Sequence, residues 1–282
     1  MRATMPTGRV DLATAVVRDT IYALGGGSST SASCAVEAYA SGTDSWRTRA
    51  QIPTCRYGLA ADTLNGLIFV TGGLTLSGMR LANTEAYDPS SNTWTAFAPM
   101  TAHRAFFGMG SVDGRLYAFG GLGDDGTILS SVERYDPGTD TWTPRAPMPH
   151  ARYGFAVAVI NDKLYAIGGS DSTHNVVATV EAYNPSTDSW TTKSPMPTAR
   201  VYLGAGATGG RIYASGGRDQ TSAAPLTVFE SYDPATGEWR SEPAMLHSRS
   251  LHAMAAIGGA LYVIGGNSQS PTPTGLTESV TP

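Results

Sequence analysis

The stretch Lys163 to Gly169 reads KLYAIGG, an apolar run with one tyrosine that stops at two glycines. Nearly the same phrase occurs six times: IYALGG at 21–26, IFVTGG at 68–73, LYAFGG at 116–121, LYAIGG at 164–169, IYASGG at 212–217 and LYVIGG at 261–266. A period in the range of roughly 40–50 residues indicates stacked supersecondary units, with propellers among the main possibilities.

Other residues recur with the same period. The tryptophans are Trp46, Trp94, Trp142, Trp190 and Trp239. The glutamates are Glu37, Glu85, Glu133, Glu181, Glu230 and Glu278. An arginine precedes each unit: Arg9, Arg56, Arg104, Arg152, Arg200 and Arg249.

Each unit contains four short runs that have the character of strands. After Arg152 they read YGFAVAVI, LYAIGG, TVEAYNP and SWTTKSP, and Asn, Asp, Gly and Pro separate them. Such runs and turn residues predict β-strands joined by tight turns. No long apolar pattern of helical period is present, so we expect almost no helix.

The double glycine, the spaced Tyr and Trp, the leading Arg and linkers such as Pro147-Met148-Pro149 and Pro195-Met196-Pro197 resemble kelch repeats over the whole chain. The resemblance implies an all-β fold, a six-bladed β-propeller of four-stranded antiparallel blades. We expect one domain, residues 1–282, with repeats that begin near the six arginines.

The sixth unit lacks its fourth strand and its Trp. Residues 278–282 align with residues 181–185, and residues 5–9 align with residues 196–200. We therefore predict that the N-terminal residues complete the last blade with a short strand, which makes this blade the weakest. The alternative, that the chain is a piece of a longer protein, stays open.

Composition limits the class of protein. The chain has 282 residues, 41% of them hydrophobic, and a net charge of −4, so nucleic acid is not an expected partner. We see neither a membrane span nor a signal peptide, which leaves a cytoplasmic protein as the default and a mature secreted form as the alternative. We expect a monomer without cofactor, and no HxH or HExxH spacing indicates a metal.

The two cysteines, Cys34 and Cys55, are expected to lie on one face of the propeller. A disulfide is geometrically conceivable, but we interpret them as two free small residues, since no secretory signal is visible.

The repeat provides an internal control, because a residue found in every unit belongs to the scaffold. The first strand of each unit is counted here from its arginine. At position +4 the residues are all small: Ala13, Ala60, Gly108, Ala156, Gly204 and Ala253. Since side chains alternate along a strand, we predict that +2, +4 and +6 face the channel and that +3 packs into the blades.

Three positions break the pattern. Position +2 holds Asp11, Gly58, Phe106, Gly154, Tyr202 and Leu251. Asp62 is a lone carboxylate at +6, where it either pairs with backbone groups or contacts a ligand in the pore. His252 stands at +3 among Leu and Phe residues, where a satisfied core histidine is the simpler interpretation.

The six arginines allow two interpretations. They are common in the family, which makes a structural role the default. They also open the inner strands at the channel mouth, and some kelch propellers that the chain resembles bind acidic peptides there through arginine. With His103, His150, His174 and His247 on the same face, we predict a cationic face.

The loops after the second strands differ from unit to unit, and variable loops on a rigid ring are a typical place for binding specificity. Asp124, Asp125, Asp171 and Asp219 in these loops are either rim contacts or ordinary turn residues.

We infer a binding module whose channel-mouth face holds a protein segment, such as an acidic peptide, or another anionic ligand. The predicted contacts are the six arginines with Asp11, Phe106, Tyr202, Asp62 and His252, and we assign no catalytic residue. One alternative, implied by the same resemblance, is a sugar-acid mutarotase with Asp11, Tyr202, Arg200 and His252 at its site. Another is a purely structural or designed repeat protein.

Overall fold

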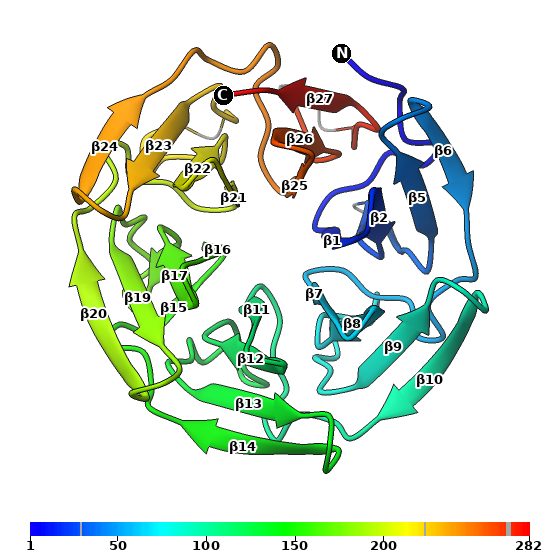
Figure 1. The fold of residues 1–282 in the computed structure, drawn as a ribbon. Coiled ribbons are helices and arrows are strands. Elements are labelled where there is room, and N and C mark those ends of the chain that lie inside the picture. Colours follow the sequence, from blue (N-terminus) through cyan, green and yellow to red (C-terminus); the bar gives the residue numbers. More distant parts are fainter. Residues whose placement is uncertain (29, 223, 269–271) are drawn as a thin grey trace.

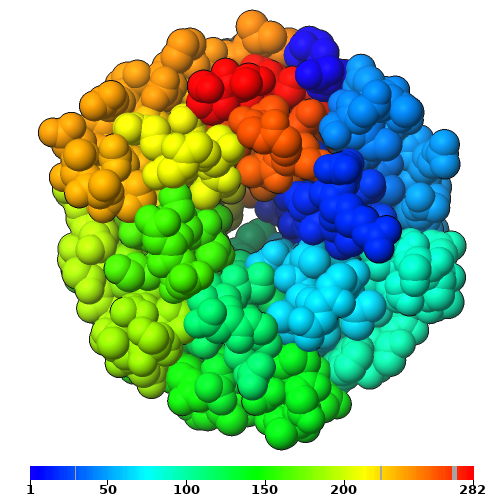
Figure 2. Space-filling model, in the orientation of Figure 1, coloured from blue at the N-terminus to red at the C-terminus, as the bar shows by residue number. Residues whose placement is uncertain are grey.

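The computed structural model describes residues 1–28, 30–222, 224–268 and 272–282. Six β-sheets stand around a central axis, and the described residues contain no helix (Figure 1). Each sheet has its first strand nearest the axis, and Figure 2 shows a hollow at the centre of the ring. The six-bladed propeller predicted from the repeat is confirmed.

Five blades have four antiparallel strands in the order of the chain. Blade one contains β1 (Ala13–Val17), β2 (Thr20–Leu24), β5 (Val36–Ala40) and β6 (Ser45–Thr48). Blade two contains β7 (Ala60–Leu64), β8 (Leu67–Thr71), β9 (Thr84–Asp88) and β10 (Thr93–Phe97). Blade three contains β11 (Gly108–Val112), β12 (Arg115–Phe119), β13 (Val132–Asp136) and β14 (Thr141–Arg145).

Blade four contains β16 (Ala156–Ile160), β17 (Lys163–Ile167), β19 (Val180–Asn184) and β20 (Ser189–Lys193). Blade five contains β21 (Gly204–Thr208), β22 (Arg211–Ser215), β23 (Phe229–Asp233) and β24 (Glu238–Ser241). Blade six has β25 (Ala253–Ile257), β26 (Ala260–Ile264) and β27 (Thr277–Val280). Two short pairs, β3 (Gly27–Ser28) with β4 (Ser31–Ala32) and β15 (Arg152–Tyr153) with β18 (Ser170–Asp171), lie at the loops.

Two-residue turns join the first and second strands of the blades. Asn65-Gly66 and Asp113-Gly114 are examples, and all four residues have positive φ. Turns with two positive φ values match the twist of antiparallel strands, which is why Asn-Gly and Asp-Gly are favoured there.

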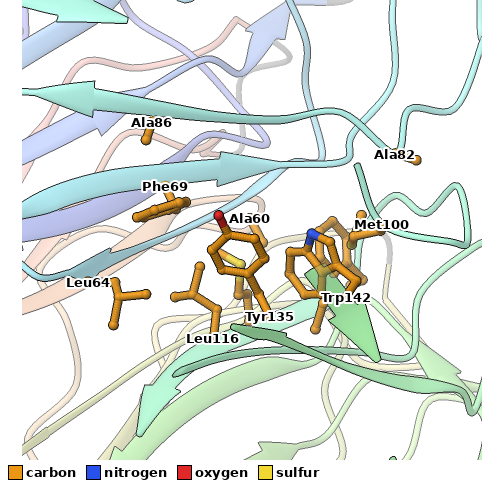
Figure 3. Close-up of a cluster of buried hydrophobic side chains, with 12 residues drawn as sticks. Ala60, Leu64, Phe69, Ala82, Ala86, Met100, Leu116, Tyr135 and Trp142 are labelled. Carbon is orange, nitrogen blue, oxygen red and sulfur yellow. The ribbon is translucent and has the colours of Figure 1, made fainter. Parts of the chain in front are cut away.

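The hydrophobic cores lie between blades. In the cluster of Figure 3, Ala60 and Phe69 of blade two pack with Leu116, Tyr135 and Trp142 of blade three. Tyr135 is fully buried and Trp142 nearly so. The repeated aromatic residues therefore join each blade to its neighbour, and burial of such large side chains stabilises the closed ring.

A repeated polar contact fastens the outer edges. Each tryptophan donates its indole N–H to a backbone carbonyl at the end of the preceding blade, as Trp94 does to Ala50 at 3.0 Å. Trp46 makes the same bond to Ala3 at 2.9 Å. Ala3 thus occupies in blade six the place that Ala50 occupies in blade one.

The N-terminal residues complete blade six. Arg2 N donates to Thr277 O at 3.0 Å and Met5 N to Gly275 O at 2.8 Å, so residues 2–5 run beside β27. They form two backbone bonds but no regular strand. The prediction of closure by the N-terminus is confirmed, and the closing segment is shorter than the strand that it replaces.

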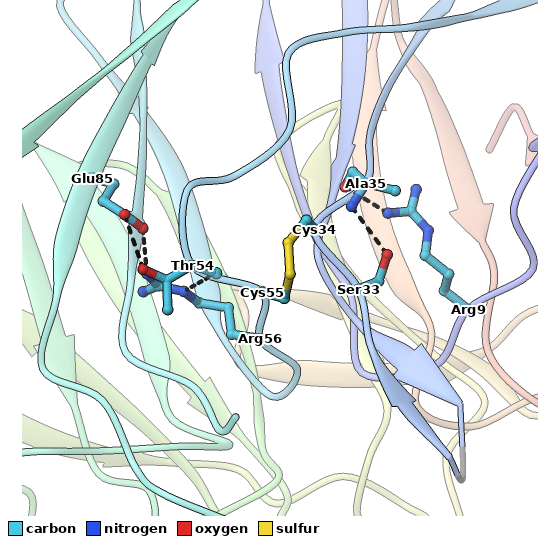
Figure 4. The surroundings of a disulfide bond; sticks show 8 residues. All are labelled: Arg9, Ser33, Cys34, Ala35, Thr54, Cys55, Arg56 and Glu85. Atoms are coloured by element: carbon cyan, nitrogen blue, oxygen red, sulfur yellow. Dashed lines mark hydrogen bonds and ion pairs between the residues drawn. A yellow bond between two sulfur atoms is a disulfide. The ribbon is translucent and has the colours of Figure 1, made fainter. Parts of the chain in front are cut away.

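The cysteines form a disulfide, which corrects the interpretation of Cys34 and Cys55 as free residues (Figure 4). Cys34 ends the loop between β2 and β5, and Cys55 lies in the linker to blade two. Ile52 N donates to Cys34 O at 2.9 Å, so backbone bonds already hold the two segments side by side. That proximity lets the bond form, and spacing along the sequence does not reveal it.

Candidate functional site

The six leading arginines are buried in the blades. Each is at most 1% exposed and pairs with the glutamate of its own unit. The pairs are Arg9–Glu37, Arg56–Glu85, Arg104–Glu133, Arg152–Glu181, Arg200–Glu230 and Arg249–Glu278. Figure 4 shows the pair in blade two. Burial lowers the pKa of each arginine from its ordinary value, and the facing glutamate opposes that shift.

Each of these arginines also donates a hydrogen bond to the carbonyl of the first glycine in the double glycine of its unit. Arg152 donates to Gly168 O at 2.9 Å and to Thr179 O at 2.8 Å, besides its bond to Glu181 at 2.6 Å. Gly168 has a positive φ, and its carbonyl lies outside the strand ladder. The guanidinium therefore satisfies buried acceptors at the end of the second strand, as it must in a packed interior.

The prediction that the arginine ring contacts a ligand at the entrance is therefore wrong. All six side chains turn into the blades, where their glutamates and backbone acceptors use them. The structural interpretation, which the sequence left as the default, is the one that the structure shows.

Position +2 forms a closed ring of backbone hydrogen bonds around the mouth. Each residue donates its N–H to the carbonyl of its counterpart in the preceding blade, at 2.7 to 3.0 Å. The donors, in order, are Asp11 to Leu251, Gly58 to Asp11, Phe106 to Gly58, Gly154 to Phe106, Tyr202 to Gly154 and Leu251 to Tyr202. All six residues have positive φ, between 52° and 62°.

This backbone geometry favours glycine, which holds the position in blades two and four. A residue with a side chain there costs about 1–3 kcal/mol and persists only where its surroundings enforce it. Phe106, Tyr202, Leu251 and Asp11 take the strained conformation all the same. Their side chains are therefore expected to have a role that offsets this cost.

The two glycines make room for aromatic rings. A Cβ at Gly58 would lie 3.0 Å from the ring of Phe106, and one at Gly154 would lie 3.0 Å from the ring of Tyr202. Each ring thus lies across the glycine of the preceding blade.

Two further tyrosines extend this aromatic wall. The ring centroids of Tyr57 and Phe106 are 6.2 Å apart, those of Phe106 and Tyr202 5.9 Å, and those of Tyr202 and Tyr153 6.2 Å. The planes meet at 64° to 69°, which is the favourable edge-to-face arrangement. We call Tyr57, Phe106, Tyr153 and Tyr202 the mouth aromatics.

A cavity of about 110 Å³, the mouth pocket, lies inside the ring. It is lined by the +2 residues and by the buried +3 residues: Leu12, Leu59, Phe107, Phe155, Leu203 and His252. The prediction that +3 packs into the blades is confirmed, since these side chains are 5 to 7% exposed. Burial raises the pKa of Asp11 in this pocket to about 7, and the positive charge of Arg218 opposes the shift.

Only one of the two ring nitrogens of His252 has a hydrogen-bond partner among the described residues. Its Nε2 lies 2.9 Å from the hydroxyl of Ser215, whereas its buried Nδ1 has no hydrogen-bond partner among the described residues. Burial, with the positive charges of Arg249 and Arg200, lowers its pKa to about 3. The imidazole is therefore neutral at physiological pH, with a free ring nitrogen in a residue that lines the mouth pocket.

Arg218 is a mouth residue that the sequence comparison missed. Its Nε donates to Ser250 Oγ at 2.9 Å, and its NH2 donates to the Asn267 side chain at 2.7 Å once that amide is oriented to satisfy both of its atoms. It is partly exposed and follows a double glycine. The other blades hold Gly27, Leu74, Leu122, Ser170 and Asn267 at this position, so the same internal comparison would have singled out a lone cation.

Asp62 lies away from the mouth. Its carboxylate accepts hydrogen bonds from the backbone N–H of Thr63 at 2.7 Å and of Ser111 at 2.6 Å. The bond from Ser111 links blade two to blade three. It lines a second cavity of about 390 Å³ along the channel. Burial raises its pKa, and these hydrogen bonds oppose the shift. The pairing with backbone groups is thus the observed state, and the structure does not bring Asp62 to the other candidates.

The prediction that +4 faces the channel is wrong, whereas most of the +6 residues do line the channel cavity as predicted. The small +4 residues are buried between blades, as Ala60 shows in Figure 3. Side chains at +5 and +7, such as Thr14, Met109 and Val159, line the channel cavity together with the +6 residues. An inner strand is a sheet edge, so both of its faces look toward neighbouring blades and neither looks straight at the axis.

The variable loops contact one another around the rim. His103 Nδ1 lies 2.8 Å from Asp124, and Arg80 donates to the backbone of Asp124 at 2.7 Å. Asp171 and Asp219 accept bonds from residues two to four positions onward, so both are turn residues. Residues 29, 223 and 269–271 of these loops lie outside the described part of the chain.

Within the described ranges, no group of three or more His, Cys, Asp or Glu side chains is placed to hold a metal ion. In the same ranges, no helix is long and apolar enough to cross a membrane.

Comparisons with known proteins agree with this geometry. The attractin/LZTR1 β-propeller family matches residues 68–280, which is more than half of the chain. The chain belongs to this family. A kelch motif matches residues 8–51, so the two matches together account for nearly every blade of the attractin/LZTR1-type propeller.

A solved structure titled "Structure of YjhT" is similar, with a TM-score of 0.87 and 17% identity. The match covers 99% of this chain and 95% of that one, and at this identity it supports the fold alone. The comparison with curated proteins gives no match.

Proposed function

We propose that this propeller is a binding module that takes up a segment of a partner protein at its mouth. The observation that carries the proposal is the strained ring: Asp11, Phe106 and Tyr202 stand at positions where glycine is the relaxed choice, and all three line one pocket. Phe106 and Tyr202 line that pocket, and Tyr57 and Tyr153 pack against their rings. Large rigid aromatic residues are typical anchors in protein interfaces.

The contacts are assigned accordingly. Asp11, Phe106, Tyr202 and His252 form the pocket into which one side chain of the segment inserts. An anionic group elsewhere on the segment would find Arg218 at the rim, because the six leading arginines are buried.

The test is selection of a random displayed peptide library on the propeller, with removal of every peptide that also binds the double variant Phe106→Gly, Tyr202→Gly. Glycine is the natural residue at this ring position in two blades, so the variant is expected to keep its fold. We expect an enriched peptide family that depends on both rings. A selection in which no peptide remains enriched after this removal would contradict a mouth site.

One observation favours a second candidate, a sugar-acid mutarotase. A carboxylate with a pKa of about 7 is suited to proton transfer at neutral pH, and Arg218 could clamp an acid group. Anomer exchange of sugar acids, followed by NMR with wild type and Asp11→Asn, tests it. Exchange that is absent in both proteins would remove this candidate, and with no peptide either the chain would be a purely structural repeat protein.

A further inference from the structure

Asp11 differs from the other carboxylates that point into the molecule. The six repeated glutamates each pair with an arginine, and Asp62 accepts two backbone N–H groups. Asp11 accepts no hydrogen bond and has no ion pair within 4.0 Å among the described residues. Asp11 is half-buried and lines the mouth pocket, so its carboxylate is open to a cationic ligand that would supply the partner it lacks among the described residues.

Aromatic rings share the pocket with this carboxylate. Phe106, Phe107, Phe155 and Tyr202 all line it. The face of an aromatic ring carries a negative potential and attracts a cation, most strongly when water is excluded. A carboxylate and several rings around one small space therefore favour a positive charge for the same reason.

None of the charged or titratable groups near Asp11 forms an ion pair with it among the described residues, so its carboxylate can pair with a cation from a ligand. Arg218, from the loop after β22, is held by Ser250 and Asn267 and lies outside ion-pair distance of Asp11. His252, from the start of β25, stays neutral because its pKa is lowered to about 3. Tyr202 stays protonated, since burial and the negative potentials of Tyr153 and Asp11 raise its pKa.

We propose that the mouth pocket binds an alkylammonium group, with Asp11 as its counter-ion and with Phe106 and Tyr202 as its walls. This inference rests on the proposed function and names the group that the ligand inserts. The size agrees: an engineered apolar cavity of about 150 Å³ holds benzene, and the mouth pocket of about 110 Å³ fits a slightly smaller group.

The proposal reverses the charge that the sequence suggested. An anion in the pocket would meet Asp11 as a like charge and the negative faces of the rings, and the six arginines that would have attracted it are turned away. Binding of the cation should also strengthen as the pH rises through about 7, because Asp11 must ionise to act as counter-ion.

Choline and 3,3-dimethyl-1-butanol, which have the same shape but differ in charge, are the probes for a small-molecule source. N-acetyl-lysine amide and N-acetyl-norleucine amide are the matched pair for a protein side chain. Binding is measured by calorimetry at constant ionic strength on wild type, on Asp11→Asn and on Asp125→Asn. Asn tolerates the positive φ of position 11, and the control removes an exposed carboxylate from a loop on the same face.

We expect at least one charged probe to bind about tenfold more tightly than its neutral partner, a difference of about 1.4 kcal/mol. Asp11→Asn should abolish that difference, and Asp125→Asn should keep it. Choline alone would point to a small quaternary ammonium, and the lysine probe alone to a partner side chain. Equal affinity within both pairs, or a preference that survives Asp11→Asn, would overturn the proposal.

The two proposals can fail separately. Suppose that the selected peptides require Phe106 and Tyr202 but carry no Lys, and that each charged probe binds no better than its neutral partner. This result would contradict the ammonium site and support the binding module. Binding of an ammonium probe without any peptide that depends on Phe106 and Tyr202 would support the ammonium site and contradict the peptide-binding module.

Discussion

Two layers of the propeller lie only two residues apart in every blade, and they repeat in different ways. The arginine layer repeats its chemistry: six guanidiniums, six glutamates and six glycine carbonyls in the same arrangement. The mouth ring repeats only its backbone: six positive φ values and six N–H···O bonds, with Asp, Gly, Phe, Gly, Tyr and Leu as side chains. Identical chemistry marks what every blade needs, whereas identical backbone with different side chains marks where the blades have been made unequal.

The comparison also shows what repetition does not reveal. A residue that recurs six times at the mouth of a channel can point into it or away from it, and only packing decides which. In this propeller the buried acceptors at the double glycines bind the arginines, so the arginine side chains point into the blades, whereas the strained residues surround the mouth.

The largest expected effect comes from breaking the arginine layer. Arg104→Met leaves Glu133, which is buried, without its cation, and removal of one partner of a buried pair typically destabilises by about 3–5 kcal/mol. Urea unfolding measures the change. The control is Arg115→Met, whose pair with Asp136 at 3.1 Å is partly exposed and should contribute less than about 1 kcal/mol. Equal losses in both variants would show that the arginine layer is no more structural than the surface.

The sequence was sufficient for the features that depend on period and local geometry. The spacing of the glycine pairs gave the number of blades, and the alignment of residues 5–9 with residues 196–200 gave the closure, now seen as the bonds of Arg2 and Met5 to the β27 region. The break of pattern at +2 gave Asp11, Phe106 and Tyr202, which the structure brings into one pocket.

The remaining features depend on directions that no repeat encodes. The positive φ at +2 interrupts strand alternation, so the count of faces from +2 to +4 fails, and the small residues at +4 pack between blades. Tyr57, Tyr153 and Arg218 were missed because they reach the mouth from position +1 and from the residue after the double glycine. The disulfide depends on a distance between two loops, to which sequence separation is no guide.

The disulfide offers a second way to test the comparison, because it adds to one blade a bond that the others lack. Reduction, or Cys34→Ala with Cys55→Ala, should lower the free energy of unfolding by about 3 kcal/mol, the usual value for a closed loop of this length. Denaturant unfolding with and without reductant measures it. No change on reduction would mean that the bond is not formed in solution.

The same bond should be transferable to blade three. Met148 N donates to Ser130 O at 2.8 Å and Arg152 N to Leu129 O at 3.3 Å, which matches Ile52 N to Cys34 O at 2.9 Å and Arg56 N to Ser33 O at 3.2 Å. Ser130→Cys with Ala151→Cys should therefore oxidise to a bond of similar strength. Failure to oxidise would show that the linkers are less alike than these bonds indicate.

The mouth ring should respond in the opposite sense to the arginine layer. The pKa of Asp11 is raised to about 7 from an ordinary value of about 4, so the folded protein binds this proton more tightly and loses stability as the pH rises from 4 to 7. Asp11→Asn removes that loss. Its free energy of unfolding should exceed that of wild type by about 1–2 kcal/mol at pH 8, with the difference shrinking toward pH 4. A difference that does not vary with pH would mean that Asp11 is solvated like a surface carboxylate.

The smallest effect concerns a position where the repeat has lost a contact. In blades one to four, an Asp or Asn oxygen accepts a tyrosine hydroxyl and a backbone N–H of the preceding blade, as Asn92 does from Tyr87 at 2.6 Å and Ala50 at 2.9 Å. Blade five has Gly237 there, with φ of 76°, and a Cβ would find Tyr232 Oη at 3.9 Å.

Gly237→Asn should restore both hydrogen bonds without backbone strain, since Asn92 has φ of 58°. The expected gain is about 1 kcal/mol in the free energy of unfolding. Gly237→Ala, which cannot accept a hydrogen bond and tolerates positive φ poorly, should give no gain. If the new bond to Tyr232 forms, Tyr232→Phe must remove part of the gain from the Asn variant and less from wild type. Equal effects of Tyr232→Phe in both backgrounds would mean that the seam between blades four and five closes in another way, and that a deviation from the repeat can be harmless as well as functional.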